Sequence, residues 1–409
     1  MDNSSFIQSI IDNDYAKFRN LLGSHKVNEH IYSFQMKERN KYSSYHQEKP
    51  ALPETNLSLL HIAAYCDSLE IFIYLQEDCH LPLDFKSISN YSPIHYACYG
   101  GSLEVVSYIL QKDPKQATIL PDVEHHLLYL ATCSGNASIL SLLFRCNADI
   151  CCIENERDSA IIQAIKLPNV PCLKILLKEG SRRNHASRGY TPIMEALKLE
   201  QKDAIPLLLE YGEDPSSFSE DGQCALSIAS FQQYTDTVRL LCEKIGTIEP
   251  NPMSPHYKRS AVHWGCQSYT PEIMEILLEK NIDVNALDSS GYCGPHYLID
   301  VGNDEDNIKI LEMLYRKGFN PNIKNPKENI SLLEEFMTSI SNHFEIIQWL
   351  IEHNADLLQK QEGTGIRLVN ILQKKFGLPP KLKELIQPYI DEAKRLDNQE
   401  KQFGNVNKI

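Results

Sequence analysis

The stretch "YSPIHYACYGGSLEVVSYIL" at residues 91–110 decides the fold, because it predicts two short helices joined by a glycine turn. From Val105 onward, apolar residues recur with the spacing of one helix face. Gly101 marks the turn between the two helices. His95 and Cys98 lie one helical turn apart in the first helix, so the stretch also raises the question of a thiol active site.

The same pattern recurs along the chain with a period of about 33 residues. Residues 58–75 and 126–144 align with the opening stretch and keep its apolar positions, small residues and turns. A regular period of this length predicts a stacked repeat array, in which each helix pair buries one face against its neighbours. The positions equivalent to His95, called the marker positions below, are Ile7, His61, His95, Tyr129, Ile162, Met194, Ser227, His263, His296 and Glu334.

Residues 91–110 and 189–215 resemble ankyrin repeats, whose signature is Thr-Pro-Leu-His-x-Ala on a 33-residue period. The resemblance covers about residues 3–358 and implies an all-α ankyrin-repeat solenoid of about ten helix-pair units, with capping units at both ends. It also implies that the marker histidine hydrogen-bonds backbone between adjacent repeats. A catalytic dyad of His95 and Cys98 is therefore not expected.

The repeat period divides the chain into segments. Residues 1–23 are expected to form an N-terminal capping helix pair, followed by a polar, tyrosine-containing insertion loop at 24–56. The repeat array is expected at 57–361, C-terminal capping helices at 362–395 and a polar tail at 396–409. Within the array, the acidic run at 300–310 is predicted to be a solvated loop between two helices.

Charge and hydropathy limit the classes of partner. The formal net charge of −14 disfavours nucleic acid and anionic membrane surfaces, which would repel the chain. No stretch approaches the ~18 apolar residues of a membrane span, and the N-terminus lacks a secretory signal. We expect a cytoplasmic protein with reduced cysteines, and nuclear entry remains open.

Signatures of catalysis are missing from the sequence. It contains no phosphate-binding glycine loop and no nucleophile elbow, so we expect no enzyme and no cofactor. The nearest metal candidate combines Cys146, Cys151 and Cys152 with His125 and His126, but zinc-type Cys-x-x-Cys spacing is absent, so no metal is expected. A metal- or thiol-dependent enzyme stands as the alternative from another class.

Binding is the expected function, through the concave surface that hairpins and first helices form in such arrays. Tyrosine, tryptophan and arginine are the residue types enriched at binding hot spots. For the tyrosines the alternative role is packing between repeats, and for the arginines it is plain solvation. An aromatic groove in an acidic protein predicts a protein partner with basic and apolar contact residues. The candidate contacts are Tyr91, Tyr96, Tyr99, Arg182, Arg183, Arg188, Tyr190, Trp264, Tyr292 and Tyr297.

The C-terminal segment allows two interpretations. "FGLPPKLKELI" at 376–386 resembles the Leu-Pro part of a SOCS box, a segment that follows ankyrin repeats in substrate receptors of cullin-type ubiquitin ligases. The first helix of a SOCS box carries a Leu-x-x-x-Cys motif, and here Leu372, four residues after Leu368, stands in place of that cysteine. The other interpretation is a degenerate capping repeat, which an array needs to cover its terminal apolar face.

Overall fold

The computed structural model describes residues 3–23, 57–87, 90–118, 126–148, 160–179, 189–245, 257–299, 302–339, 343–375 and 377–406. In these residues the regular structure is helical, and the extended pairing is limited to isolated β-bridges. The chain forms two compact units, Met1–Asp214 and Pro215–Ile409.

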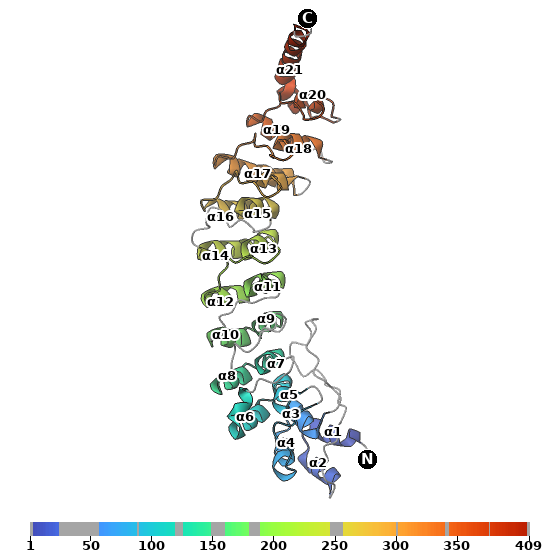
Figure 1. Ribbon diagram of the computed structural model, residues 1–409, viewed down its shortest axis with the longest axis vertical. Helices are drawn as coiled ribbons and strands as arrows, with labels where there is room; N and C mark the ends of the chain where they lie inside the picture. The colour runs from blue at the N-terminus through green and yellow to red at the C-terminus, as the bar shows by residue number, and fades with distance from the viewer. Residues whose placement is uncertain are drawn as a thin grey trace. The chain divides into compact units, whose positions relative to one another are not determined.

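The first unit consists of consecutive helix pairs, coloured blue to green in Figure 1. The two helices of a pair contact each other, and the first helices of successive pairs also contact one another. The pairs are α1 (Asn3–Ile11) with α2 (Tyr15–Leu22), α3 (Leu59–Cys66) with α4 (Leu69–Ile73) and the π-helix η1 (Tyr74–Asp78), α5 (Pro93–Gly100) with α6 (Leu103–Lys112), α7 (Leu127–Ser134) with α8 (Ala137–Arg145), α9 (Ala160–Lys166) with α10 (Val170–Lys178), and α11 (Pro192–Lys198) with α12 (Ala204–Glu210). The short 3₁₀-helix η2 (Pro114–Ala117) follows α6.

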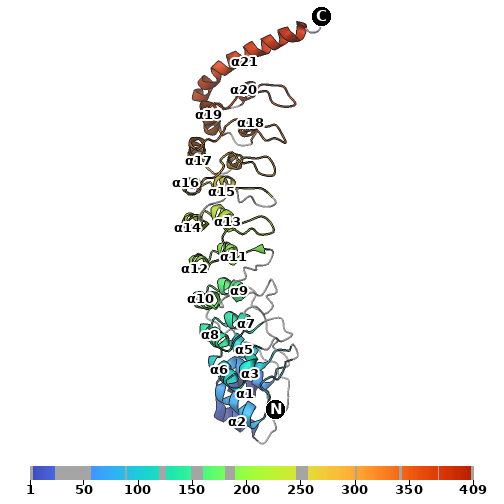
Figure 2. The ribbon, with the colours of Figure 1, turned by 60° about the vertical axis from the view of Figure 1, so that its left-hand side comes forward.

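The second unit repeats this arrangement. Within it, the hairpin loops project on the side of the first helices, and the second helices form the opposite side (Figure 2). Its pairs are α13 (Ala225–Phe231) with α14 (Thr235–Ile245), α15 (Ala261–Ser268) with α16 (Pro271–Leu278), the 3₁₀-helix η4 (Gly294–Leu298) with α17 (Asp304–Arg316), α18 (Leu332–Thr338) with α19 (Phe344–Glu352), and α20 (Leu368–Leu372) with α21 (Pro380–Val406).

Every marker position lies in the first helix of a pair, so the predicted all-α repeat architecture is confirmed. The helix ends follow local sequence signals. Ser92 precedes α5 and forms a capping box with His95, Pro93 begins the helix, and Gly101 ends it in the left-handed conformation with φ 75°.

Hairpins precede the first helices of the second unit and are bonded to one another by asparagine side chains. Asn325 donates from Nδ2 to the carbonyl of Ser290 at 3.1 Å, one repeat earlier. Asn285 donates in the same way to the carbonyl of Gly318 at 3.0 Å. These bonds hold successive hairpins in register, which fixes the positions of the side chains that they carry.

The acidic stretch at 300–310 differs from its prediction as a solvated loop. Residues 304–310 form the first turns of α17, because Asn303 caps the helix by accepting the backbone N–H of Asp306 at 2.8 Å. Asp304, Glu305 and Asp306 then occupy the first turn, where negative charge is favourable near the positive end of the helix dipole.

The C-terminal segment folds as the last helix pair of the second unit. Leu368, Leu372, Leu382 and Ile386 join its hydrophobic core. Helix α21 continues to Val406, so most of the segment 396–409, the predicted polar tail, is helical. The predicted insertion loop at 24–56 lies outside the described residues.

Candidate functional site

Four of the aromatic residues proposed from the sequence are buried. Tyr96 is 0 % and Trp264 2 % exposed, and Tyr91 and Tyr190 are also buried. The Tyr96 ring packs edge-on against the ring of His61, with 5.1 Å between their centroids. Packing between repeats, the alternative role considered for these tyrosines, is therefore what the structure shows, and partner contact by the four residues stays an untested prediction.

The remaining proposed residues fall into three places. Tyr99 is half-buried beside Tyr65, with 6.1 Å between the ring centroids. Arg182, Arg183 and Arg188 lie outside the described residues. Two residues of the set, described next, come together at one pocket.

Tyr292 and Tyr297 line a pocket of about 360 Å³ within the second unit. It lies between η4, with the hairpin that precedes it, and α18 of the following pair, on the hairpin and first-helix side. Its lining mixes aromatic, aliphatic and polar side chains. The lining residues are Tyr292, His296, Tyr297, Ile299, Glu335, Thr338 and Ser339.

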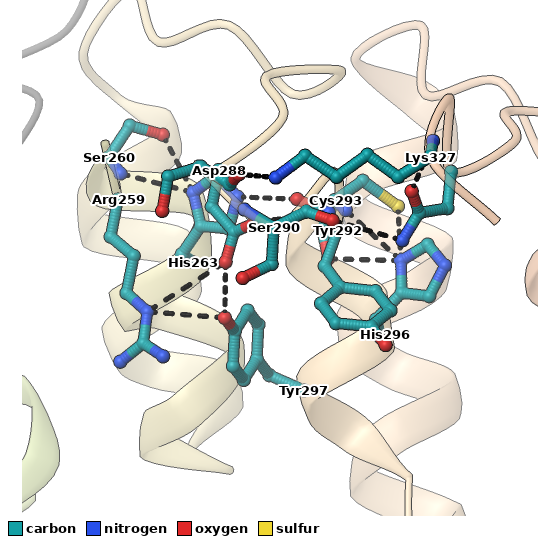
Figure 3. A network of polar contacts seen from close by, with 12 residues as sticks. Arg259, Ser260, His263, Asp288, Ser290, Tyr292, Cys293, His296, Tyr297 and Lys327 are labelled. Carbon is teal, nitrogen blue, oxygen red and sulfur yellow. Dashed lines mark hydrogen bonds and ion pairs between the residues drawn. The ribbon is translucent and has the colours of Figure 1, made fainter. Parts of the chain in front are cut away.

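A polar network of Asp288 and Arg259 holds the Tyr297 side chain at its hydroxyl group (Figure 3). The Tyr297 hydroxyl donates to Asp288 Oδ2 at 2.5 Å and accepts from Arg259 Nε at 3.1 Å. The Arg259 guanidinium also lies over the Tyr297 ring, 4.8 Å from its centroid. Burial, followed by the bond to Asp288, raises the pKa of Tyr297, so the hydroxyl keeps its proton near neutral pH.

The backbone at Tyr292 is held by the preceding repeat. His263 Nδ1 accepts the backbone N–H of Ser260 at 3.0 Å, so its proton is on Nε2, which lies 3.1 Å from the carbonyl oxygen of Tyr292. Asp288 Oδ1 accepts the N–H of Tyr292 at 3.0 Å. The tyrosine is thus presented by a rigid turn.

At His296 the bonding pattern of the repeat changes. His296 Nδ1 accepts the N–H of Cys293 at 3.1 Å, which again places the proton on Nε2. At His61 and His263 the group facing Nε2 is a backbone carbonyl, whereas at His296 it is the carboxylate oxygen Oε2 of Glu335, 3.1 Å away.

Burial shifts the pKa values of both His296 and Glu335. Burial lowers the pKa of His296 to about 4, so the imidazole is neutral at pH 7. Burial, followed by repulsion from Glu328, raises the pKa of the Glu335 carboxyl to about 7. The carboxyl is therefore close to half ionised in neutral solution.

Glu335, Thr338 and Ser339 were not singled out from the sequence, although a signal existed for Glu335. It follows the marker position Glu334 directly, as Tyr297 follows His296. Residues at this register of neighbouring repeats share a face, so the pair could have been placed on the same side.

The buried thiols among the described residues give no support to the enzyme alternative. Cys98 is fully buried, and burial raises the pKa of its thiol far above neutrality. Burial also raises the pKa of Cys224 and Cys242 to about 11. A catalytic cysteine needs a lowered pKa and access to solvent.

The described ranges contain neither a metal centre nor a membrane-spanning helix. No group of three His, Cys, Asp or Glu residues there could hold a metal ion. Cys151, Cys152 and His125 of the candidate metal set lie in the gaps of the structure. None of the helices described is both long and apolar enough to cross a membrane.

Paired helices with projecting hairpins, joined by histidines that reach the next repeat, define an ankyrin-type repeat protein. The family model "Ankyrin repeats (3 copies)" matches residues 24–120, 128–219 and 213–288, more than half of the chain, and the chain belongs to this family. Ankyrin repeats imply a scaffold for protein–protein interaction, and the family is typically non-catalytic.

The relatives are much longer proteins. "Ankyrin repeat and KH domain-containing protein mask-1" of Caenorhabditis elegans is 25% identical over 240 residues, which cover 53% of this chain and 9% of that protein. The Caenorhabditis briggsae protein CBG24701, of the same description, is 25% identical over 186 residues, 45% of this chain and 7% of that protein. The chain therefore spans less than a tenth of these curated relatives. Among solved structures, the human ASB11 ankyrin repeat domain shares 18% identity and a TM-score of 0.42, over 65% of this chain and 100% of that chain.

Proposed function

We propose that the protein is a non-catalytic cytoplasmic scaffold that binds a partner protein through the hairpin and first-helix side of its second unit. The observation that carries this proposal is the pocket between η4 and α18. It combines tyrosine rings with a partly exposed carboxylate, and aromatic side chains beside polar groups are the usual composition of a protein contact site.

The rigid backing of the pocket also supports binding. Tyr297 is held by Asp288 and Arg259, and the turn at Tyr292 is held by His263. Side chains that are ordered before association lose little conformational freedom when a partner binds. The pocket is thus suited to be the central contact of a larger interface.

The C-terminal helices support a capping role in this proposal. The apolar residues Leu368 and Leu372 of α20 are buried in the core of the second unit. A SOCS-box-like recruitment role would need an apolar face available to an adaptor, and no observation favours it.

Filling the pocket tests the proposed function. Thr338 is exposed at the pocket, so Thr338→Arg should block it without removing a core contact. Gln387→Arg adds the same charge on the exposed face of α21 and serves as the matched control. Partners captured by the full chain would be identified by mass spectrometry, purified and measured by calorimetry.

We expect Thr338→Arg to weaken direct binding of a captured partner at least tenfold, and Gln387→Arg to leave it within twofold. Unfolding curves of both variants would verify that each is folded. Equal binding of the partner by both variants would refute the assignment of binding to this surface.

A further inference from the structure

We propose that the pocket between η4 and α18 receives the side-chain cation of a lysine or arginine from a basic partner protein, with the Glu335 carboxylate as its counter-ion. This inference rests on the proposed function, since it names the chemistry of the partner at the same surface. Three independent features of the described lining lead to it: the direction of its hydroxyl protons, the state of its carboxylate and the position of its rings.

The hydroxyl groups of Thr338 and Ser339, at the end of α18, already donate their protons within the protein. Thr338 Oγ1 donates to the carbonyl oxygen of Glu334 at 3.0 Å, and Ser339 Oγ donates to the carbonyl oxygen of Phe336 at 3.0 Å. A hydroxyl has one proton and two lone pairs, so these groups can only accept a further hydrogen bond.

The hydroxyl groups of Tyr292 and Tyr297 also donate their protons within the protein. Tyr297 donates its proton to Asp288, and the Tyr292 hydroxyl is hydrogen-bonded to the Glu328 carboxylate, which can only accept. The Tyr297 hydroxyl also accepts from Arg259, so it has no donor for a ligand, and the Tyr292 hydroxyl offers a ligand only a lone pair. A ligand that meets several acceptors must itself supply donors, and lysine and arginine side chains supply donors and no acceptors.

His296 carries the only ring N–H among the described lining residues, and this N–H faces a side chain of the protein itself. His296 is 7 % exposed, and its Nε2 faces Glu335 Oε2 at 3.1 Å. The contact lacks hydrogen-bond geometry, but Nε2 is buried, so an anionic ligand would meet the Glu335 carboxyl before it could reach this donor. The arrangement therefore favours a cation over phosphate and carboxylate ligands.

Glu335 lacks a full charge partner. Its side chain is 26 % exposed, and its described neighbour His296 is neutral at pH 7 because burial lowers the histidine pKa. Partial burial without a cation is also the main cause of the raised pKa of the Glu335 carboxyl. A bound ammonium or guanidinium group would compensate the carboxylate and favour its ionised form.

The remaining lining fits the rest of a basic side chain. The rings of Tyr292 and Tyr297 and the aliphatic Ile299 can cover the methylene groups that precede the charge. Tyr297 already carries the Arg259 guanidinium over its ring at 4.8 Å, so this ring binds a cation within the protein itself. The formal net charge of −14 attracts a basic partner from a distance.

Small cationic probes test the inference without knowledge of the partner. The full chain, with ¹³C-labelled tyrosine rings, would be titrated with Nα-acetyl-lysine methylamide and Nα-acetyl-arginine methylamide. The norleucine analogue, which has the length of lysine without its charge, is the control ligand. Tyrosine signals assigned by Tyr292→Phe and Tyr297→Phe would report binding by NMR.

Saturable shifts of the Tyr292 and Tyr297 signals are expected with both cations and not with norleucine. Glu335→Gln should reduce the affinity at least tenfold, whereas Glu345→Gln, the same change at an exposed site of α19, should leave it unchanged. No saturation by either cation, equal binding of norleucine, or unchanged affinity in folded Glu335→Gln would overturn the inference.

A measurement on the unaltered chain covers the case in which Glu335→Gln is unstable. Because the Glu335 carboxyl is close to half protonated at pH 7, cation binding should release a fraction of a proton, seen by calorimetry in buffers of different ionisation enthalpy. Cation binding without proton release would count against Glu335 as the counter-ion.

The two proposals fail in distinguishable ways. If the cations do not bind but Thr338→Arg still abolishes partner binding, the surface is right and its ligand chemistry is wrong. If the cations bind and Thr338→Arg leaves the partner unaffected, the pocket chemistry is right and the partner binds elsewhere.

Discussion

Two of the marker histidines, His61 and His263, each join adjacent repeats through a single ring. In the first unit, His61 Nδ1 accepts the N–H of Ser58 at 3.2 Å, and Nε2 lies 3.2 Å from the carbonyl oxygens of Phe85 and Tyr91. Burial lowers the pKa of His61 to about 4, so the ring stays neutral and keeps one donor and one acceptor. The same geometry at His263 holds the turn that presents Tyr292.

Removing one such histidine leaves several backbone groups unpaired. His61→Ala should lower the free energy of unfolding by about 2–3 kcal/mol, because buried groups lose their partners. His80→Ala, at an exposed histidine of the same repeat, should change it by less than about 0.5 kcal/mol. Urea unfolding measures both values, and equal effects would contradict the structural role of the ring.

Acid should destabilise the protein through these histidines. Burial lowers the pKa values of His61 and His296 to about 4 and of His95 to about 3, against 6.5 when unfolded. The folded state therefore binds fewer protons, and its stability is full above pH 6.5 and is lost as the pH falls toward the folded pKa values. Between pH 7 and 5 each histidine should cost up to about 2 kcal/mol.

The ionisation of Glu335 changes the stability with pH in the opposite direction to that of the histidines. Its pKa is about 7 when folded and 4.5 in the reference state, so its contribution falls as the pH rises from 4.5 to 7. Among the described residues, the groups that face it are His296, Glu328 and the Tyr292 hydroxyl. Urea unfolding between pH 5 and 8 should show a net loss toward acid that is shallower in His61→Ala. A flat profile would contradict neutral buried histidines.

At the scale of elements, the hairpin before η4 depends on glycine. Gly291 has φ 90°, a left-handed conformation, and a Cβ there would lie 2.3 Å from Asn325 Oδ1, whose side chain bonds the two hairpins. Gly318 also has a positive φ, 93°, but a Cβ there would meet nothing within 4 Å.

Comparing these glycines separates backbone strain from steric conflict. Gly318→Ala should cost about 1 kcal/mol from strain alone. Gly291→Ala should cost at least about 1 kcal/mol more, since Asn325 must move and its bond to Ser290 is lost. Thermal unfolding of the two variants tests this order, and equal losses would show that the hairpin contact contributes nothing.

The sequence was sufficient for the helix pairs and insufficient for the pocket. Each pair is specified by local signals, such as the Ser92 capping box and the left-handed Gly101. The burial of Tyr96 and the partial exposure of Tyr297 could not be predicted from register, since both follow a marker histidine. Tyr96 packs against the ring of His61, whereas Tyr297 lies at a 3₁₀ turn that opens toward α18.

For the whole molecule, acidic charge and a repeat scaffold favour a basic protein partner. The net charge of −14 raises the encounter rate with such a partner, and the pocket gives one of its cations a defined place. The second helices of the second unit lie on the opposite side from the hairpins (Figure 2), so only one of the two sides should contact the partner.

The most direct measurement is site-specific photo-crosslinking with a purified partner. The crosslinking residue would replace Lys327, exposed on the hairpin beside Tyr292, or Arg316, exposed on α17 of the opposite side. Adducts from position 327 and none from position 316 are the predicted result. Adducts from position 316 alone would contradict the central claim that the hairpin and first-helix side binds the partner.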